Sequence, residues 1–187
     1  MTRYELWLLF HVLAAVVWAG GVFALGVAGI SAERTRAPVE LPVLARINAW
    51  VGPRIATPAA VVAFVAGVLL VVDGPWSWDD LWIVLGLAGF ALTFLPGFFF
   101  LTPESKRIRD AVQREGPGSP EAAWRVRRVL LVSRAAIVLL FLVIADMVVK
   151  PTGDDAAVLA GGVVVLALLL AGVVALFRAA PRPPEPS

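Results

Sequence analysis

The sequence predicts an all-α protein, a polytopic transmembrane helical bundle of about five spans in which four helices form a core and a C-terminal span follows. Three observations predict this fold class. Of the 187 residues, 60% are hydrophobic and only 16% are charged, whereas a water-soluble domain has about 25% charged residues. The apolar residues gather in runs long enough to cross the roughly 30 Å hydrocarbon core of a bilayer as helices. The basic residues between these runs lie mostly on one side.

The apolar runs are continuous, and a transmembrane strand would instead alternate over about 10 residues. The first run contains Glu5 and His11 but no clear cleavage site, so we expect a retained span rather than a signal peptide. The third contains Pro96 and Gly97, where we expect a kink. We predict one transmembrane domain over 1–178 and a disordered tail over 179–187, with spans at about 4–30, 55–72, 81–101, 129–149 and 156–177.

The regions between the spans predict further helices but no repeat. The loop after the first span has apolar residues at helical spacing, which predicts a short helix lying on the membrane: Leu41, Leu44, Ile47 and Val51. Pro103 and Pro120 each stand where a helix can begin, so we expect a charged helix after the third span and a helix that runs on into the fourth. No convincing internal repeat is visible.

The distribution of basic residues predicts the orientation of the chain. Fourteen of the 16 Lys and Arg residues fall in the loops after spans one and three, at the start of span four, or after span five. Arg3 and Lys150 alone fall on the other side. Because basic loops stay in the cytoplasm, we expect a multi-pass protein of a bacterial inner membrane with its N-terminus outside and its C-terminus in the cytoplasm.

The composition also excludes several kinds of site. The chain has no cysteine, so it has neither disulfides nor thiolate metal sites. The basic loops lack the interleaved aromatic residues that stack on bases, so we expect no nucleic acid as a partner. The partners that we do expect are the lipid bilayer and, without an identity, a second copy of the chain or another membrane protein.

Few residues are left to carry chemistry inside the membrane, where an ionisable side chain is costly and therefore a functional candidate. His11 lies about 10 Å below the outer end of the first span, and Asp146 lies within about one turn of the outer end of the fourth. If these spans touch, the imidazole and the carboxylate could pair. Trp18 lies on the same face as His11, two turns further along, and Met147 follows Asp146. We therefore predict a cofactor site formed by His11, Trp18, Asp146 and Met147, with His11 as the one metal ligand; packing alone is the alternative.

The segment from His11 to Gly21 has the form H-x6-W-x-G-G. It resembles the first helix of a bacterial superfamily that includes the copper-resistance D proteins and the J-type protoporphyrinogen oxidases. Over about residues 4–150 the chain is most similar to the integral-membrane family known as domain of unknown function 2269. The resemblance to the oxidases implies that His11, Trp18 and Gly20 correspond to that family's motif residues, with haem binding and porphyrinogen oxidation. The resemblance to the copper proteins implies metal handling, but a single subunit with one His, two Met and no Cys cannot assemble a Cu(I) site of soft ligands.

These observations leave the function open between classes and do not decide whether the protein is an enzyme. The first hypothesis is a small integral membrane protein that binds haem or a porphyrin through His11, with Met147, Lys150, water or a second subunit as the other axial ligand. The alternative is a scaffold or accessory subunit with no cofactor. A second alternative is a component for transport of a metal or small molecule.

Overall fold

The computed structural model describes residues 1–34, 40–116 and 119–179, and these residues form helices and turns without a strand. Five helical stretches of the described chain are long and apolar enough to cross a membrane. This confirms the predicted fold class. The helices, with two π-helical turns, are α1 (Arg3–Arg34), α2 (Glu40–Val51), η1 (Gly52–Ala56), α3 (Thr57–Asp73), α4 (Leu81–Pro96), η2 (Gly97–Leu101), α5 (Thr102–Glu115), α6 (Pro120–Val149) and α7 (Ala156–Ala179). The predicted tail lies outside the described residues, apart from Ala179 at the end of α7.

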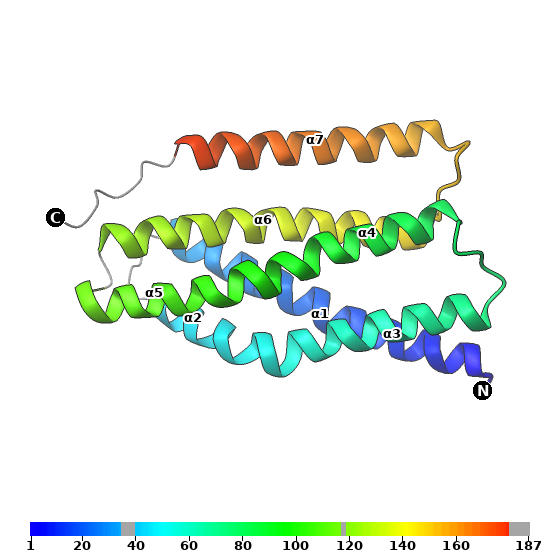
Figure 1. Cartoon of the computed structure of the whole chain (residues 1–187), viewed down its shortest axis with the longest axis horizontal. Helices are drawn as coiled ribbons and strands as arrows, with labels where there is room; N and C mark the ends of the chain where they lie inside the picture. The colour runs from blue at the N-terminus through cyan, green and yellow to red at the C-terminus, as the bar shows by residue number, and fades with distance from the viewer. Residues whose placement is uncertain (35–39, 117–118, 180–187) are drawn as a thin grey trace.

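The spanning helices associate in pairs (Figure 1). The most extensive contact is between α1 and α3, followed by that between α4 and α6, and α1 also packs against α6. The last helix, α7, contacts α6, and none of the residues in its most apolar stretch is buried. The observed arrangement is therefore the predicted one, with four helices in a core and a C-terminal span beside it.

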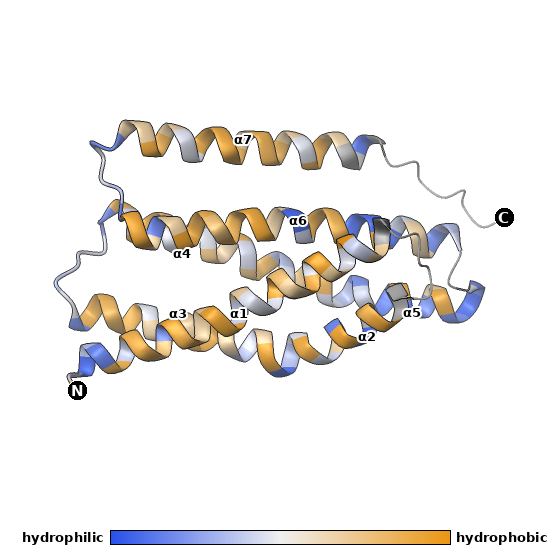
Figure 2. Cartoon of the chain, turned by 180° about the vertical axis from the view of Figure 1, so that it is seen from behind, coloured by the Kyte–Doolittle hydropathy of each residue, from blue (hydrophilic) through white to orange (hydrophobic). Residues whose placement is uncertain are grey.

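The helices of the bundle are apolar along most of their length (Figure 2). Large side chains such as Val16, Phe99 and Leu168 are exposed by 64%, 70% and 68%. A soluble protein of this size does not leave so much contiguous apolar surface in water. The hydrocarbon of a bilayer is the medium that fits this surface, because lipid tails are as apolar as the side chains.

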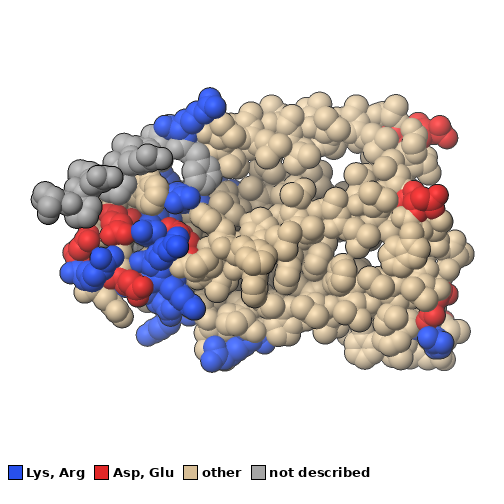
Figure 3. Space-filling view, in the orientation of Figure 1, with Lys and Arg blue, Asp and Glu red and all other residues tan. Residues whose placement is uncertain are grey.

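Charged side chains gather at the two ends of the bundle (Figure 3). We call one the acidic end: it holds the N-terminus of α1, the α3–α4 loop and the α6–α7 loop, with Asp73, Asp79, Asp80, Asp154 and Asp155. We call the other the basic end: it holds α5, the start of α6 and the end of α7. This separation of charge agrees with the asymmetry seen in the sequence.

The α6–α7 loop at the acidic end is held by a local hydrogen-bonded turn. Asp155 accepts hydrogen bonds from the Thr152 backbone N–H at 2.7 Å and from the Thr152 hydroxyl at 2.9 Å. These bonds favour the ionised form and hold the pKa of the exposed Asp155 carboxyl below its usual value. The turn is therefore favoured at neutral pH and lost as the pH falls through the lowered pKa.

Two π-helical turns join spanning helices to helices at the basic end. In each turn an N–H donates to a carbonyl five residues back, from Thr57 to Gly52 and from Thr102 to Gly97. A proline follows each threonine, and both segments share the pattern G-x4-T-P. The wider turn suits proline, which lacks the N–H that an α-helix would need there. This seven-residue pattern is the one repeat that the structure brings out.

The π-helical turns differ from the separate helix expected after the first span and agree with the kink expected in the third span. The predicted helix after the first span exists as α2, and it is continuous with α3 through η1 rather than separate from it. The reason is that the turn accommodates Pro53 and Pro58 without ending the helix. The kink expected at Pro96 and Gly97 corresponds to the start of η2.

Glycines allow α4 and α6 to pack closely. A Cβ added at Gly89 would collide with the Cγ2 atom of Val143, and Val143 is β-branched and has little freedom to move away. Gly86 stands one turn earlier on the same helix, against Met147. Small residues at this spacing bring helices together in lipid, where no hydrophobic force drives them.

We therefore expect Gly89→Ala to lower the free energy of unfolding by about 1–3 kcal/mol, because the extra methyl group overpacks the α4–α6 contact. Unfolding in mixed micelles with increasing SDS, followed by circular dichroism, measures the change. Val143→Ala in the same chain is expected to restore most of the loss. Gly162→Ala on α7 is the matched control, because a Cβ there meets nothing within 4 Å. Equal losses at both glycines would contradict the proposed close packing.

Candidate functional site

His11 lies on α1 and is bound to α3 by a hydrogen bond. Its Nδ1 atom is 2.7 Å from the backbone carbonyl oxygen of Ala63. Because a carbonyl can only accept, the Nδ1 atom carries the proton and donates. The neutral imidazole then keeps its lone pair on Nε2, the form in which histidine binds a metal.

Gly67 makes this position of the imidazole possible. A Cβ added there would lie 3.2 Å from both Cε1 and Nδ1 of His11. A side chain at that position would therefore press the ring away from the Ala63 carbonyl. Ala59, Ala63 and Gly67 form a row of small residues on α3, and this row positions the His11 ring in addition to packing the helices.

Trp18 is a packing residue of the core. Its ring is 9% exposed and packs with Ala60 of α3 and Leu140 of α6. The ring centroid of Phe90, on α4, is 5.2 Å away, and Phe90 in turn stacks on Phe64 of α3 at 5.1 Å. Ala14, between His11 and Trp18, is buried as well. The face of α1 between His11 and Trp18 is thus largely filled by protein.

Asp146 and Met147 lie against α4 rather than beside His11. A Cβ at Gly86 would meet the Met147 methyl group and would lie 3.4 Å from Oδ2 of Asp146. Both carboxylate oxygens of Asp146 are buried and have no hydrogen-bond partner among the described residues. The structure therefore does not form the imidazole–carboxylate pair that contact between these spans would allow. The physical reason is that the His11 ring bonds to α3, while Asp146 faces the α4–α6 contact.

Lys150 and two tryptophans lie just beyond Asp146 at the acidic end. Lys150 ends α6 in a left-handed conformation with a φ of 51°. Its Nζ atom lies 3.8 Å from the ring centroid of Trp76 and 5.0 Å from that of Trp82. Both contacts are cation–π interactions. Lys150 is thus engaged by aromatic rings.

The beginning of α1 is fastened to the end of α3. The Trp7 indole N–H donates to Oδ2 of Asp73 at 3.0 Å, and the Arg3 guanidinium lies 3.4 Å from the same oxygen. Trp7 is one turn before His11 on α1. This contact fixes α1 against α3 on the acidic side of the imidazole, as Trp18 does on the basic side.

The helix pairs part near the acidic end. The space-filling view has an opening there between α4 and α3, and another between α7 and the helices beside it (Figure 3). The aromatic contacts of Phe90 with Trp18 and Phe64 join the two pairs. Within the described residues, no group of three or more His, Asp or Glu side chains could hold a metal ion. A metal at His11 would need ligands from a cofactor, from water or from another chain.

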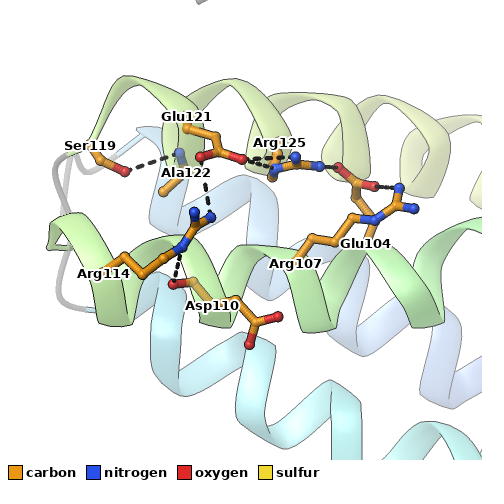
Figure 4. Close-up of polar contacts among 8 residues, drawn as sticks. All are labelled: Glu104, Arg107, Asp110, Arg114, Ser119, Glu121, Ala122 and Arg125. Carbon is orange, nitrogen blue, oxygen red and sulfur yellow. Dashed lines mark hydrogen bonds and ion pairs between the residues drawn. The ribbon is translucent and has the colours of Figure 1, made fainter. Parts of the chain in front are cut away.

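At the basic end the structure shows a buried ionic network that the sequence did not indicate (Figure 4). Glu104 of α5 is 1% exposed and accepts hydrogen bonds from Arg125 of α6 at 2.7 Å and from Arg107 at 3.2 Å. Glu121 binds Arg125 at 2.8 Å and Arg114 at 3.5 Å. Ser119 accepts a hydrogen bond from the Ala122 N–H at the start of α6. The network holds α5 against α6.

The helical periodicity of the α5 sequence could have predicted that Glu104 is buried. The buried residues of that helix are Glu104, Ser105, Ile108 and Ala111. Glu104, Ile108 and Ala111 are spaced by four and three residues, which places them on one face. A carboxylate on an otherwise apolar face predicts a buried ion pair, because burying an unpaired carboxylate costs much more free energy than burying a paired one.

Comparisons with known proteins agree with the fold. A family model described as "Predicted integral membrane protein (DUF2269)" matches residues 5–151, which include α1 to α6 and exclude α7. No curated protein and no solved structure matches the chain. The similarity to the copper-resistance and protoporphyrinogen oxidase proteins stays a prediction. The chain is an integral membrane protein with several spans, and it belongs to the DUF2269 family.

Proposed function

We propose that this protein binds a haem, or a related porphyrin, through the imidazole of His11. The observation that carries the proposal is the hydrogen bond from Nδ1 to the Ala63 carbonyl. Such a bond fixes the tautomer and the orientation of a histidine ligand. It leaves Nε2 as the coordinating atom, and one histidine nitrogen is sufficient for one axial position of a haem.

The opening between α3 and α4 supports this proposal, because a flat ring needs a gap between helices (Figure 3). Trp18 and Ala14 are buried in the core, so the ring would not lie along that face of α1. A bound haem would supply one-electron chemistry. The chain itself would bind and orient the group through His11, with water or a second subunit supplying any further ligand.

Haemin titration tests the proposal. We expect the apoprotein in detergent micelles to bind haemin with a shift of the Soret band, and His11→Ala to weaken the affinity at least tenfold because the ligand is lost. His11→Gly with added imidazole is expected to regain the wild-type spectrum. Leu8→Ala, one turn away on the exposed surface of α1, is the control. Equal affinities of wild type and His11→Ala would contradict the proposal.

A scaffold or accessory subunit with no cofactor is the second candidate. The observation that favours it is that Trp18, the other prominent residue of the H-x6-W-x-G-G segment, packs in the core. In that case the segment would serve to hold α1 against α3 and α4. The same titration separates the two, because a scaffold gives no Soret shift with or without His11.

We also propose that the acidic end faces outward and the basic end faces the cytoplasm of a bacterial inner membrane. The separation of charge supports this orientation. The cysteine-free sequence allows single cysteines to be labelled with an impermeant maleimide in intact cells. We expect Asp154→Cys to be labelled from outside and Glu115→Cys only after lysis; both positions are exposed. The reverse pattern would overturn the orientation.

A further inference from the structure

The α2 helix and the π-helical turn after it present three exposed residues at intervals of four. These are Arg46, Trp50 and Arg54, with Trp50 exposed by 54%. The Arg54 guanidinium lies over the Trp50 ring, 5.5 Å from its centroid. Residues four apart share one face of a helix. We call this set the Arg–Trp–Arg face.

The two arginines of this face differ from arginines at the α5–α6 contact. Arg107, Arg114 and Arg125 are each bound to Glu104 or Glu121. Arg46 and Arg54 pair with no carboxylate within the part of the chain that the structure describes. Two exposed guanidiniums that no described carboxylate neutralises form a local positive surface beside an indole.

The position of this face along the bundle places it where hydrocarbon meets the headgroups. At about 1.5 Å per residue, the helix from Arg54 to Asp73 at the acidic end is about 28 Å long, close to the roughly 30 Å of a bilayer's hydrocarbon core. Asp73 is bonded to Trp7 and Arg3 at the opposite interface. Tryptophan favours the interface because its ring is apolar and its N–H is polar. The Arg54 guanidinium therefore lies at the level of the lipid phosphates, and Arg46, two turns further along the helix, lies about 12 Å beyond it on the aqueous side.

We propose that the Arg–Trp–Arg face is a binding site for the headgroup of an anionic phospholipid. The guanidiniums of Arg46 and Arg54 bind the phosphate and the headgroup charge, since their paired N–H groups match phosphate oxygens. The Trp50 indole packs against the glycerol and the first methylene groups. The positive charge of the two arginines, at the depth of the headgroups, is complementary to an anionic lipid, so a lipid is the occupant. The Arg–Trp–Arg face does not include His11, so lipid binding there does not depend on whether haem binds.

Native mass spectrometry of the whole protein, released from nanodiscs of phosphatidylcholine and phosphatidylglycerol, tests the site. We expect wild type to retain phosphatidylglycerol over phosphatidylcholine. Arg46→Gln with Arg54→Gln is expected to reduce the retained phosphatidylglycerol about tenfold, because each replacement removes one attraction between a guanidinium and the anionic headgroup. Arg46→Lys with Arg54→Lys is expected to lose less of the bound phosphatidylglycerol, since lysine keeps the positive charge but lacks the paired N–H donors of arginine.

Lys106→Gln with Arg127→Gln is the matched control, because it removes two exposed positive charges from the same end of the bundle. We expect this variant to retain phosphatidylglycerol as wild type does. Trp50→Leu, with both arginines present, is expected to fall between the control and the double arginine variant. An equal loss in the control would overturn the proposal in favour of unspecific charge attraction, and undiminished retention in the double arginine variant would overturn it outright.

Discussion

Replacing Glu104 with alanine is expected to lower the free energy of unfolding by about 3 kcal/mol, as breaking a buried ion pair does. Glu104 is 1% exposed, and the Arg125 side chain that it binds is 20% exposed. Without Glu104, the one described ion-pair partner left to Arg125 is Glu121 on the same helix. The helix α5 then loses the 2.7 Å contact of Glu104 with Arg125, its shortest ion pair with α6. Arg107 contributes little to this loss, because its side chain is 63% exposed and water can replace the carboxylate.

The measurement is unfolding in mixed micelles at increasing SDS, followed by the far-ultraviolet circular dichroism of the helices. Glu115→Ala is the matched control, since Glu115 is an exposed carboxylate at the end of the same helix. We expect it to change stability by less than about 0.5 kcal/mol. If the Glu104 and Glu115 variants unfold alike, the network does not hold α5 against α6.

Replacing Asp146 with leucine is expected to raise the free energy of unfolding by about 2 kcal/mol. Both oxygens of Asp146 are buried in the α4–α6 contact without a hydrogen-bond partner among the described residues. An unsatisfied buried polar group costs about 1–3 kcal/mol, and a carboxylate within a membrane span is costly for the same reason. Leucine keeps the branched shape at Cγ, so the contact with Gly86 is largely preserved.

Asp73→Leu is the control for the Asp146 variant. Asp73 accepts a hydrogen bond from Trp7 and pairs with Arg3, so its loss is expected to lower stability, with the opposite sign. The same micelle unfolding experiment measures both variants. A loss of stability in Asp146→Leu would show that Asp146 has a stabilising partner. A gain in stability together with weaker haemin binding would show that the residue is retained for a ligand.

The spans could be predicted from the sequence because the bilayer imposes a length. A helix needs about 20 mostly apolar residues, within a range of about 17–25, to cross the hydrocarbon. The presence of five spans therefore follows from the number of apolar runs of this length. The third predicted span, 81–101, coincides with α4 and η2 together. The fourth span was predicted from residue 129, and the helix that was expected to begin at Pro120 and run on into it is α6. Its first turns are polar and carry the ionic network, so hydropathy alone could not include them.

The pairing of helices could not be predicted, because it depends on which surfaces fit together. His11 and Asp146 could have paired if their spans touched, and α1 and α6 do pack together. The imidazole nevertheless bonds to Ala63, because Gly67 leaves room for the ring on α3. Gly86 leaves similar room for Asp146 and Met147 on α4. Glycine positions of this kind decide contacts that the polar residues alone do not specify.

The position of Trp18 in the sequence likewise did not determine what its ring contacts. Its spacing from His11 correctly placed it two turns along α1, but did not indicate whether the ring faced a ligand or the core. The ring meets Phe90, Leu140 and Ala60, from three different helices. These contacts join residues far apart in the chain, and no local pattern predicts them.

The most direct test of the central claim is the visible absorption spectrum of the protein purified in mild detergent from haem-replete cells. The claim is that the Nε2 atom of His11, oriented by the Ala63 carbonyl, is the ligand of a haem. It predicts a Soret band in the wild-type protein and its loss in His11→Ala, with Leu8→Ala unchanged. A wild-type protein without a Soret band, or a band that persists in His11→Ala, would contradict it.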